Sequence, residues 1–316
     1  MKRVPVLYLA VIAALLLLPL ASPALAQSEG ELVGKGKTVY IDAGHGGIES
    51  GAVHVGKDGK VDLVERDVNL SIGLKLRALL ENDGFRVAMS RSTPASPNNP
   101  PIDRNNDGRV TNRDEYQAVV DLANDSGADL MVSIHNNGST NKDVSGTEVW
   151  FSPLRPFADR NLLIARLLQA NLVSSIRNAG YNTVDRGIKD DSNYRVFNGR
   201  IYEIFVLGQP DNTAFHPRAA NMPAALGESL FLSYEADAAM LAQDRIQDAI
   251  ASGYRDAIVQ YFARLAQGGP LEWPVPAAGA SYAPAAAEPA PTATPTPTPT
   301  PTPQPVWRRP RLLQMF

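Results

Sequence analysis

The chain has 316 residues, enough for one α/β domain with appendages, because a domain takes about 100–250 residues. Its formal net charge of −3 gives no sign of a nucleic-acid binder, which would carry a strongly basic surface. The chain has no cysteine, so it forms no disulfide and offers no thiolate to a metal. Any zinc site must therefore use carboxylates and the four histidines, which are His45, His54, His135 and His216.

Residues 1–26 have the pattern of a secretory signal peptide. Two basic residues precede an apolar run, and Ala24-Leu25-Ala26 provides the small residues of a cleavage site before Gln27. An uncleaved membrane anchor is the alternative, because about 17–25 apolar residues can span a bilayer. The small residues favour cleavage, which predicts export to the periplasm, the cell wall or the extracellular space. Without Lys2 and Arg3 the mature chain has 28 basic and 33 acidic residues, a net charge of −5.

The first predicted strand and the helix after it bring two polar side chains to one edge of a sheet. Val39 to Ile41 is an apolar, β-favouring run, and the glycines of AGHGG break it so that His45 follows the strand on a turn. In open α/β sheets, sites form at the C-terminal edge of the strands. The helix begins with Glu65 in an acidic first turn, so Glu65 is expected to face the same edge as His45.

The remaining predicted elements alternate between strands and helices. The strand at Asp129–His135 ends in a second histidine, and the strand at Pro223–Ser233 contains Glu228. The others, in chain order, are a strand at Phe85–Met89, a helix at Gln117–Asn124, a strand at Gly146–Ser152, a helix at Phe157–Ala179 and a helix at Ala238–Phe262.

These segments resemble the zinc-dependent N-acetylmuramoyl-L-alanine amidases of the bacterial cell wall. The resemblance is carried by GHGG around His45, ERDVNL from Glu65, ADLMVSIHNNGS around His135, RGIK at residues 186–189 and PAALGESLFLS around Glu228. It implies an α/β fold, a single domain with a mostly parallel twisted sheet flanked by helices, and a zinc site at the C-terminal edge of the strands. It also implies cleavage of the amide between N-acetylmuramic acid and L-alanine in peptidoglycan, for wall remodelling or daughter-cell separation.

The resemblance implies that His45, Glu65 and His135 bind Zn²⁺ and leave a fourth position open. A nearby carboxylate would then relay a proton from the attacking water to the leaving amine. Glu228 is the candidate for this role, and Glu148 is the second choice.

The chain departs from the family pattern in two places. Val119 stands where an arginine is usual, so the contact that this arginine makes is absent or replaced. Gly227, Ser229 and Leu230 stand where the family usually has an apolar residue, leucine and glycine, so the pocket beside Glu228 is expected to differ in shape. Two alternatives stay open: a weak or inactive peptidoglycan-binding protein on the same fold, and an exported zinc hydrolase of another wall or peptide bond.

An insertion at residues 102–115 matches a calcium-binding loop. Its oxygen-bearing side chains stand at alternate positions, a glycine permits the sharp turn, and an aspartate replaces the usual closing glutamate. The alternative is a polar surface turn. The sequence predicts a Ca²⁺ site formed by Asp103, Asn105, Asp107 and Asp114.

The other features give expectations about the rim of the site and the termini. His54 is expected to be solvated, whereas His216 is a candidate for the cleft. The segment Asp190–Met222 is long for a simple connection and is expected to line or cover the cleft. The basic, apolar tail is expected to be a disordered terminus, with contact to wall or membrane as the alternative. An activator protein is a further partner that the sequence leaves open.

The predicted organisation is a lead-in at residues 27–36, a catalytic domain at 37–267, a Pro/Ala/Thr-rich linker at 268–306 and a basic, apolar tail at 307–316.

Overall fold

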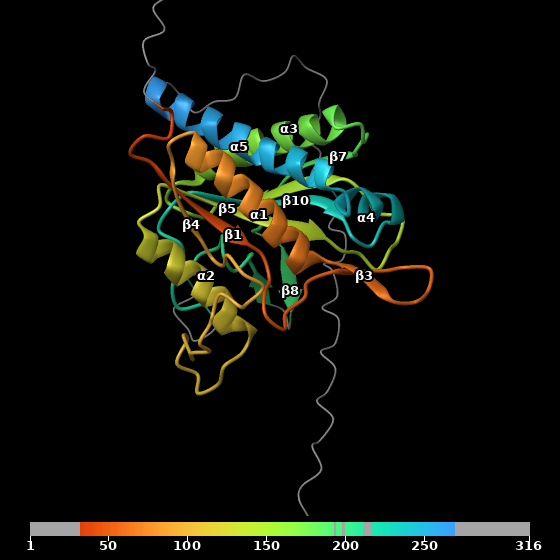
Figure 1. The fold of residues 1–316 in the computed structure, drawn as a ribbon. Coiled ribbons are helices and arrows are strands. Elements are labelled where there is room, and N and C mark those ends of the chain that lie inside the picture. The colour runs from red at the N-terminus through yellow and green to blue at the C-terminus, as the bar shows by residue number, and fades with distance from the viewer. Residues whose placement is uncertain (1–31, 193, 198–199, 211–215, 269–316) are drawn as a thin grey trace, which may run out of the picture. The chain divides into compact units, whose positions relative to one another are not determined.

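The computed structural model describes residues 32–192, 194–197, 200–210 and 216–268. Within these ranges, six strands form one sheet in the order β4-β1-β5-β10-β6-β7 (Figure 1). The single antiparallel pair in this sheet is β10 with β6, so the predicted mostly parallel α/β fold is confirmed. The strands are β1 (Thr38–Ala43), β4 (Arg86–Met89), β5 (Leu130–Asn137), β6 (Thr147–Phe151), β7 (Asp185–Asp190) and β10 (Ala224–Phe231).

Helices cover both faces of the sheet (Figure 1). One face packs on α1 (Glu65–Asn82), α3 (Ala158–Asn178) and α5 (Asp244–Gln267), and the other packs on α2 (Asn112–Ser126). Side chains of a strand alternate between the two faces. In β1, for example, Val39 and Ile41 join the α1 side of the core, whereas Tyr40 joins the α2 side.

Several details differ from the predicted elements. The predicted helix at Ala238–Phe262 is two helices, α4 (Glu235–Leu241) and α5, because Gln243 adopts an extended conformation between them. Helix α2 starts five residues before the predicted Gln117, since Thr111 and Asp114 form a capping box at its N-terminus. Two short hairpins were not predicted: β2 (Val53–Val55) with β3 (Val61–Val64), and β8 (Arg195–Phe197) with β9 (Arg200–Tyr202).

The predicted signal peptide, nearly all of the linker and the tail lie outside the described residues. In the part of the chain that is described, no helix is long and apolar enough to cross a membrane.

Candidate metal centre

Three side chains from separate elements meet at the C-terminal edge of the sheet. His45 follows β1, Glu65 is the first residue of α1, and His135 lies in β5. Oε1 of Glu65 lies 3.0 Å from Nε2 of His45 and 2.9 Å from Nδ1 of His135. One ligand atom from each residue lies within 4.8 Å of the others. Tetrahedral zinc with bonds of about 2.0–2.1 Å places its ligands roughly 3.3 Å apart, so two imidazoles and a carboxylate at this spacing fit zinc.

Two glycines leave the space that this arrangement needs. A Cβ atom at Gly44 would lie 2.3 Å from Nε2 of His135, and a Cβ atom at Gly51 would lie 2.4 Å from Oε2 of Glu65. Gly51 also has a φ of 64°, which favours glycine. His45 itself has a φ of 66°, an uncommon backbone conformation for a residue with a side chain. The backbone is therefore shaped around these three side chains.

Glu228 lies beside His135, on the neighbouring strand of the sheet. In β10 it is the register partner of His135 on one side and of Glu148 in β6 on the other, so the three side chains share a face. Oε2 of Glu228 is buried and has no hydrogen-bond partner among the described residues. Burial raises the pKa of Glu228 well above its usual value, and the negative charges of Glu65 and Glu148 raise it further. This pairing of strands places a carboxyl oxygen of Glu228 that has no hydrogen-bond partner among the described residues beside His135.

The sequence model of the N-acetylmuramoyl-L-alanine amidase family matches residues 39–260. The chain belongs to this family. The uncharacterized protein YqiI of Bacillus subtilis is 30% identical over 72% of this chain and 86% of its own length. The germination-specific amidase of the same organism is 30% identical over 72% of this chain and 80% of its own length. The CwlD amidase of Clostridioides difficile, solved in complex with the GerS lipoprotein, superposes with a TM-score of 0.53 and 25% identity over 72% of this chain and 99% of that one.

The carboxylates of this amidase create a strongly negative environment at the cluster. Burial alone would lower the pKa of His45, but Glu65 and Glu49 raise it well above its usual value. Burial would likewise raise the pKa of Glu65, yet the two histidines lower it well below the usual range. A field that stabilises a proton on a buried imidazole also stabilises a bound cation. The negative field at the cluster therefore suits a cation held by His45, Glu65 and His135.

A second set of polar groups orients the three side chains. Nδ1 of His45 is hydrogen-bonded to Glu49, which leaves Nε2 directed at Glu65. The side chain of Asn69 donates to Oε1 of Glu65 at 3.2 Å, and the backbone N–H of Ala52 donates to Oε2 at 2.7 Å. Such partners fix the tautomer and the orientation of metal ligands. Sequence reasoning missed Glu49, although a carboxylate four residues after His45 in the same glycine-rich turn was an available signal.

Arg91 holds the turn that carries His45. Its guanidinium, in a residue only 6% exposed, donates to the carbonyls of Ala43 at 2.8 Å and Gly44 at 3.0 Å. It also donates to the carbonyl of Arg66 at 2.6 Å, in the first turn of α1. One side chain thus connects the strand end that leads to His45 with the helix start that carries Glu65. No local pattern in the sequence indicates this role of Arg91.

Glu148, the second candidate for proton transfer, is fully engaged by four donors. Its Oε2 accepts from Nε of Arg186 at 2.6 Å and from Nζ of Lys189 at 2.7 Å. Its Oε1 accepts from the side chains of Asn137 at 3.0 Å and Trp150 at 3.2 Å. Burial would raise the pKa of Glu148, but the two cations lower it. Glu148 is therefore held as an ionised partner of these donors, which favours Glu228 as the residue that exchanges a proton.

The departures from the family pattern beside Glu228 point away from the cluster. A Cβ atom at Gly227 would lie 2.2 Å from the hydroxyl oxygen of Tyr254 in α5, and Leu230 belongs to the apolar core on the α1 side. Ser229 is fully buried. These substitutions alter the packing of the helices rather than the face that carries Glu228. Val119 likewise packs into the apolar core on the α2 side.

The other two histidines lie outside the cluster. His54, which was expected to be solvated, is partly exposed, and its ring nitrogens lie 2.6 Å from Asp62 and 3.2 Å from Glu235. His54 thereby joins the β2–β3 hairpin to α4. His216 is buried and stacks on Phe205, with ring centroids 4.0 Å apart, so it acts in packing.

Parts of the segment Asp190–Met222 lie against the sheet near Glu148. Tyr194 meets the ring of Trp150 edge-on, with centroids 5.1 Å apart, and Trp150 donates to Glu148. Val206 and Leu207 join the core on the α2 side. The segment thus reaches the donors that surround Glu148.

The carboxylates of the calcium-like insertion bind the insertion's own backbone. Oδ2 of Asp103 accepts from the N–H of Gly108 at 2.8 Å. Asp114 is fully buried and accepts from the N–H groups of Arg104 and Thr111, each at 2.7 Å. Across the described ranges, His45, Glu65 and His135 form the one group of three or more His, Cys, Asp or Glu residues placed to hold a metal. The structure gives no support to the predicted Ca²⁺ site.

Proposed function

We propose that this peptidoglycan amidase holds Zn²⁺ between His45, Glu65 and His135 and that Glu228 transfers the proton in hydrolysis. The bond cleaved is the amide between N-acetylmuramic acid and L-alanine. The observation that carries the proposal is the meeting of two imidazoles and a carboxylate in a space that Gly44 and Gly51 keep clear. A His₂Glu set leaves a fourth zinc position open, as in catalytic rather than structural sites.

The residues of the chain have separate tasks in this mechanism. When bound, zinc supplies a Lewis acid that polarises the scissile carbonyl and activates water. Glu228 accepts a proton from the attacking water and gives it to the leaving nitrogen of L-alanine, since its Oε2 is not engaged by another described residue. Glu49 and Arg91 keep His45 and its turn in place.

The substitution Gly51→Ala tests the geometry of the cluster. The added methyl group would collide with Glu65 and His45, so we expect loss of bound zinc and of amidase activity. Gly59→Ala is the matched control, because Gly59 also has a positive φ, 79°, but has no atom within 4 Å of the added Cβ. Both variants bear a similar backbone strain, about 1–2 kcal/mol. Metal analysis and peptide release distinguish them, and full zinc occupancy in Gly51→Ala would contradict the assigned cluster.

We propose that residues 102–115 act as a structural cap for α2 without calcium. The melting temperature should then be unchanged in millimolar Ca²⁺, since a ligand that binds only the folded state would raise it. Asp114→Ala should lower the free energy of unfolding by about 1–2 kcal/mol through loss of the capping box. A rise in melting temperature with Ca²⁺ that Asp107→Ala abolishes would instead establish the calcium site.

The substrate of the family is peptidoglycan, so we propose that residues 1–26 direct export and that the exported chain begins at Gln27. N-terminal sequencing of the exported protein tests this, and a chain that retains Lys2 would instead be anchored. Contact of residues 307–316 with wall or membrane, and an activator partner, remain proposals. The second of these follows the lipoprotein complex of the CwlD relative.

A further inference from the structure

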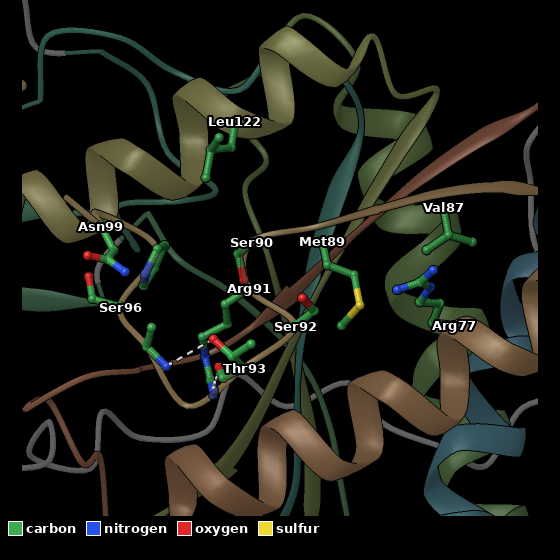
Figure 2. Close-up of a pocket in the computed structure, with 12 residues that line it drawn as sticks. Arg77, Val87, Met89, Ser90, Arg91, Ser92, Thr93, Ser96, Asn99 and Leu122 are labelled. Carbon is green, nitrogen blue, oxygen red and sulfur yellow. Dashed lines mark hydrogen bonds between the residues drawn. The ribbon is translucent and has the colours of Figure 1, made fainter.

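The side chains of the site are held in place in two different ways. Figure 2 shows Arg91 in the loop after β4, where it donates to the carbonyl of Thr93 at 3.2 Å. From this loop Arg91 also holds the turn that carries His45. Glu228 differs, because its Oε2 has no hydrogen-bond partner among the described residues. The position of this oxygen therefore depends on the main chain of β10.

The main chain of β10 is paired regularly with its neighbours only up to Glu228. The register pairs of β10 with β6 run from Leu226 to Glu228. On the other side of β10, the register with β5 shifts between Glu228 and Phe231. Such an irregularity disrupts the ladder of hydrogen bonds locally. Contacts just before Glu228 therefore have a large influence on where its side chain lies.

A tyrosine of α5 bonds this main chain directly before Glu228. The hydroxyl of Tyr254 donates to the carbonyl of Gly227 at 3.1 Å, and the carbonyl of Ser133 in β5 is a second acceptor at 3.4 Å. Tyr254 itself is fully buried in the apolar core on the α1 side. The carbonyl of Gly227 belongs to the planar peptide group that leads into Glu228, so a bond to its oxygen also restrains the Cα atom of Glu228.

Gly227 provides the space for this hydroxyl. A Cβ atom at residue 227 would collide with the hydroxyl oxygen of Tyr254 and would lie 3.2 Å from Cδ1 of Leu172. Gly227 does not have a positive φ, so space rather than backbone conformation requires glycine here. An apolar side chain, which the family usually has at this position, would occupy the place of the hydroxyl. The glycine in β10 and the tyrosine in α5 therefore form a matched pair.

The hydroxyl of Tyr254 keeps its proton at neutral pH. Burial raises the pKa of Tyr254 above its usual value, and the negative charge of Glu228 raises it further. The hydroxyl therefore remains a donor to the carbonyl of Gly227.

We propose that Tyr254 is a positioning residue for Glu228 and that Gly227 admits the hydroxyl through which it acts. This inference rests on the proposed proton transfer by Glu228. The bond to the carbonyl of Gly227 sets where the carboxyl of Glu228 lies relative to His135 and the scissile amide. A misplacement of about 1 Å can lower a rate by about 10²-fold. Tyr254 therefore acts on the rate of cleavage and not on the binding of peptidoglycan.

Tyr254→Phe tests this role, because it removes the hydroxyl and keeps the ring. With soluble muramyl peptides as the substrate, kcat should fall on the order of 10-fold, while KM and zinc content stay unchanged. Tyr261→Phe is the matched control and should keep the unmodified kcat. Tyr261 lies in the same helix and is also fully buried, but its hydroxyl has no hydrogen-bond partner among the described residues. A lower melting temperature with an unchanged kcat in zinc-loaded Tyr254→Phe would show a purely structural role and overturn the proposal.

A pair of substitutions tests whether Gly227 admits the hydroxyl. Gly227→Ala should lower kcat, because its methyl group collides with the hydroxyl of Tyr254. The double variant Gly227→Ala/Tyr254→Phe lacks the hydroxyl, so its kcat should return to that of Tyr254→Phe alone. A kcat reduced by the product of the two single losses would contradict the matched pair.

Glu228→Gln separates this inference from the proposed function. If Tyr254 acts through Glu228, adding Tyr254→Phe to Glu228→Gln should lower kcat no further. A further loss in that background, or a loss of zinc in Tyr254→Phe, would overturn the role of Tyr254 at Glu228. An unmodified kcat in Glu228→Gln would overturn both the proposed proton transfer and this inference. An impaired Glu228→Gln beside an unmodified kcat in Tyr254→Phe would overturn this inference alone.

Discussion

His135→Ala should contain no bound zinc and should release no stem peptide from peptidoglycan. His135 is one of only two imidazoles in the cluster, and Nδ1 of this residue lies 2.9 Å from Glu65. Its removal leaves one histidine and one carboxylate, too few ligands for a stable zinc site. The domain should still fold, because the apolar core on both faces of the sheet does not include His135.

His54→Ala is the matched control for this result. His54 contacts Asp62 and Glu235 rather than the cluster, so this variant should retain zinc and activity. Metal analysis of both purified variants gives the comparison directly. Full zinc occupancy in His135→Ala would remove this residue from the site.

Glu228→Gln should retain zinc and the fold while amide cleavage falls by about 10²–10⁴-fold. Glutamine has nearly the same shape but cannot accept the proton of water and return it to the amine. Glu228 is not among the three proposed ligands, so metal content should match that of the unmodified chain. Binding to insoluble peptidoglycan should persist in this variant.

Two results would change this assignment. If Glu228→Gln cleaves the amide at the unmodified rate, Glu228 does not transfer the proton, and Glu148 becomes the candidate for this role. An unmodified chain that binds peptidoglycan but releases no peptide would favour the binding-protein alternative. The first outcome conflicts with the four donors that already engage Glu148.

The sequence was most informative where local chemistry decides structure. Glycines after an apolar run predict that a strand ends in a turn, and this places His45 correctly at the edge of the sheet. An acidic first turn predicts a helix start at Glu65. The role of Arg91 was missed because it depends on carbonyl groups 25 to 48 residues away along the chain, at Arg66, Gly44 and Ala43.

The insertion at residues 102–115 shows why a motif alone does not determine a site. Carboxylates at alternate positions suit a metal, but the same oxygens also accept hydrogen bonds from nearby backbone N–H groups. Asp114 stands where a calcium loop has its closing ligand and also where a capping box has its acidic residue. The sequence cannot distinguish these uses, because the difference lies in where the oxygens point.

The products of peptidoglycan digestion give the most direct test of the assigned reaction. Purified protein loaded with zinc is incubated with peptidoglycan, and the soluble products are identified by mass spectrometry. We expect stem peptides with a free N-terminal L-alanine and glycan strands without new reducing ends. Peptides that still carry muramic acid, or new reducing ends in the glycan, would contradict cleavage of the amide between N-acetylmuramic acid and L-alanine.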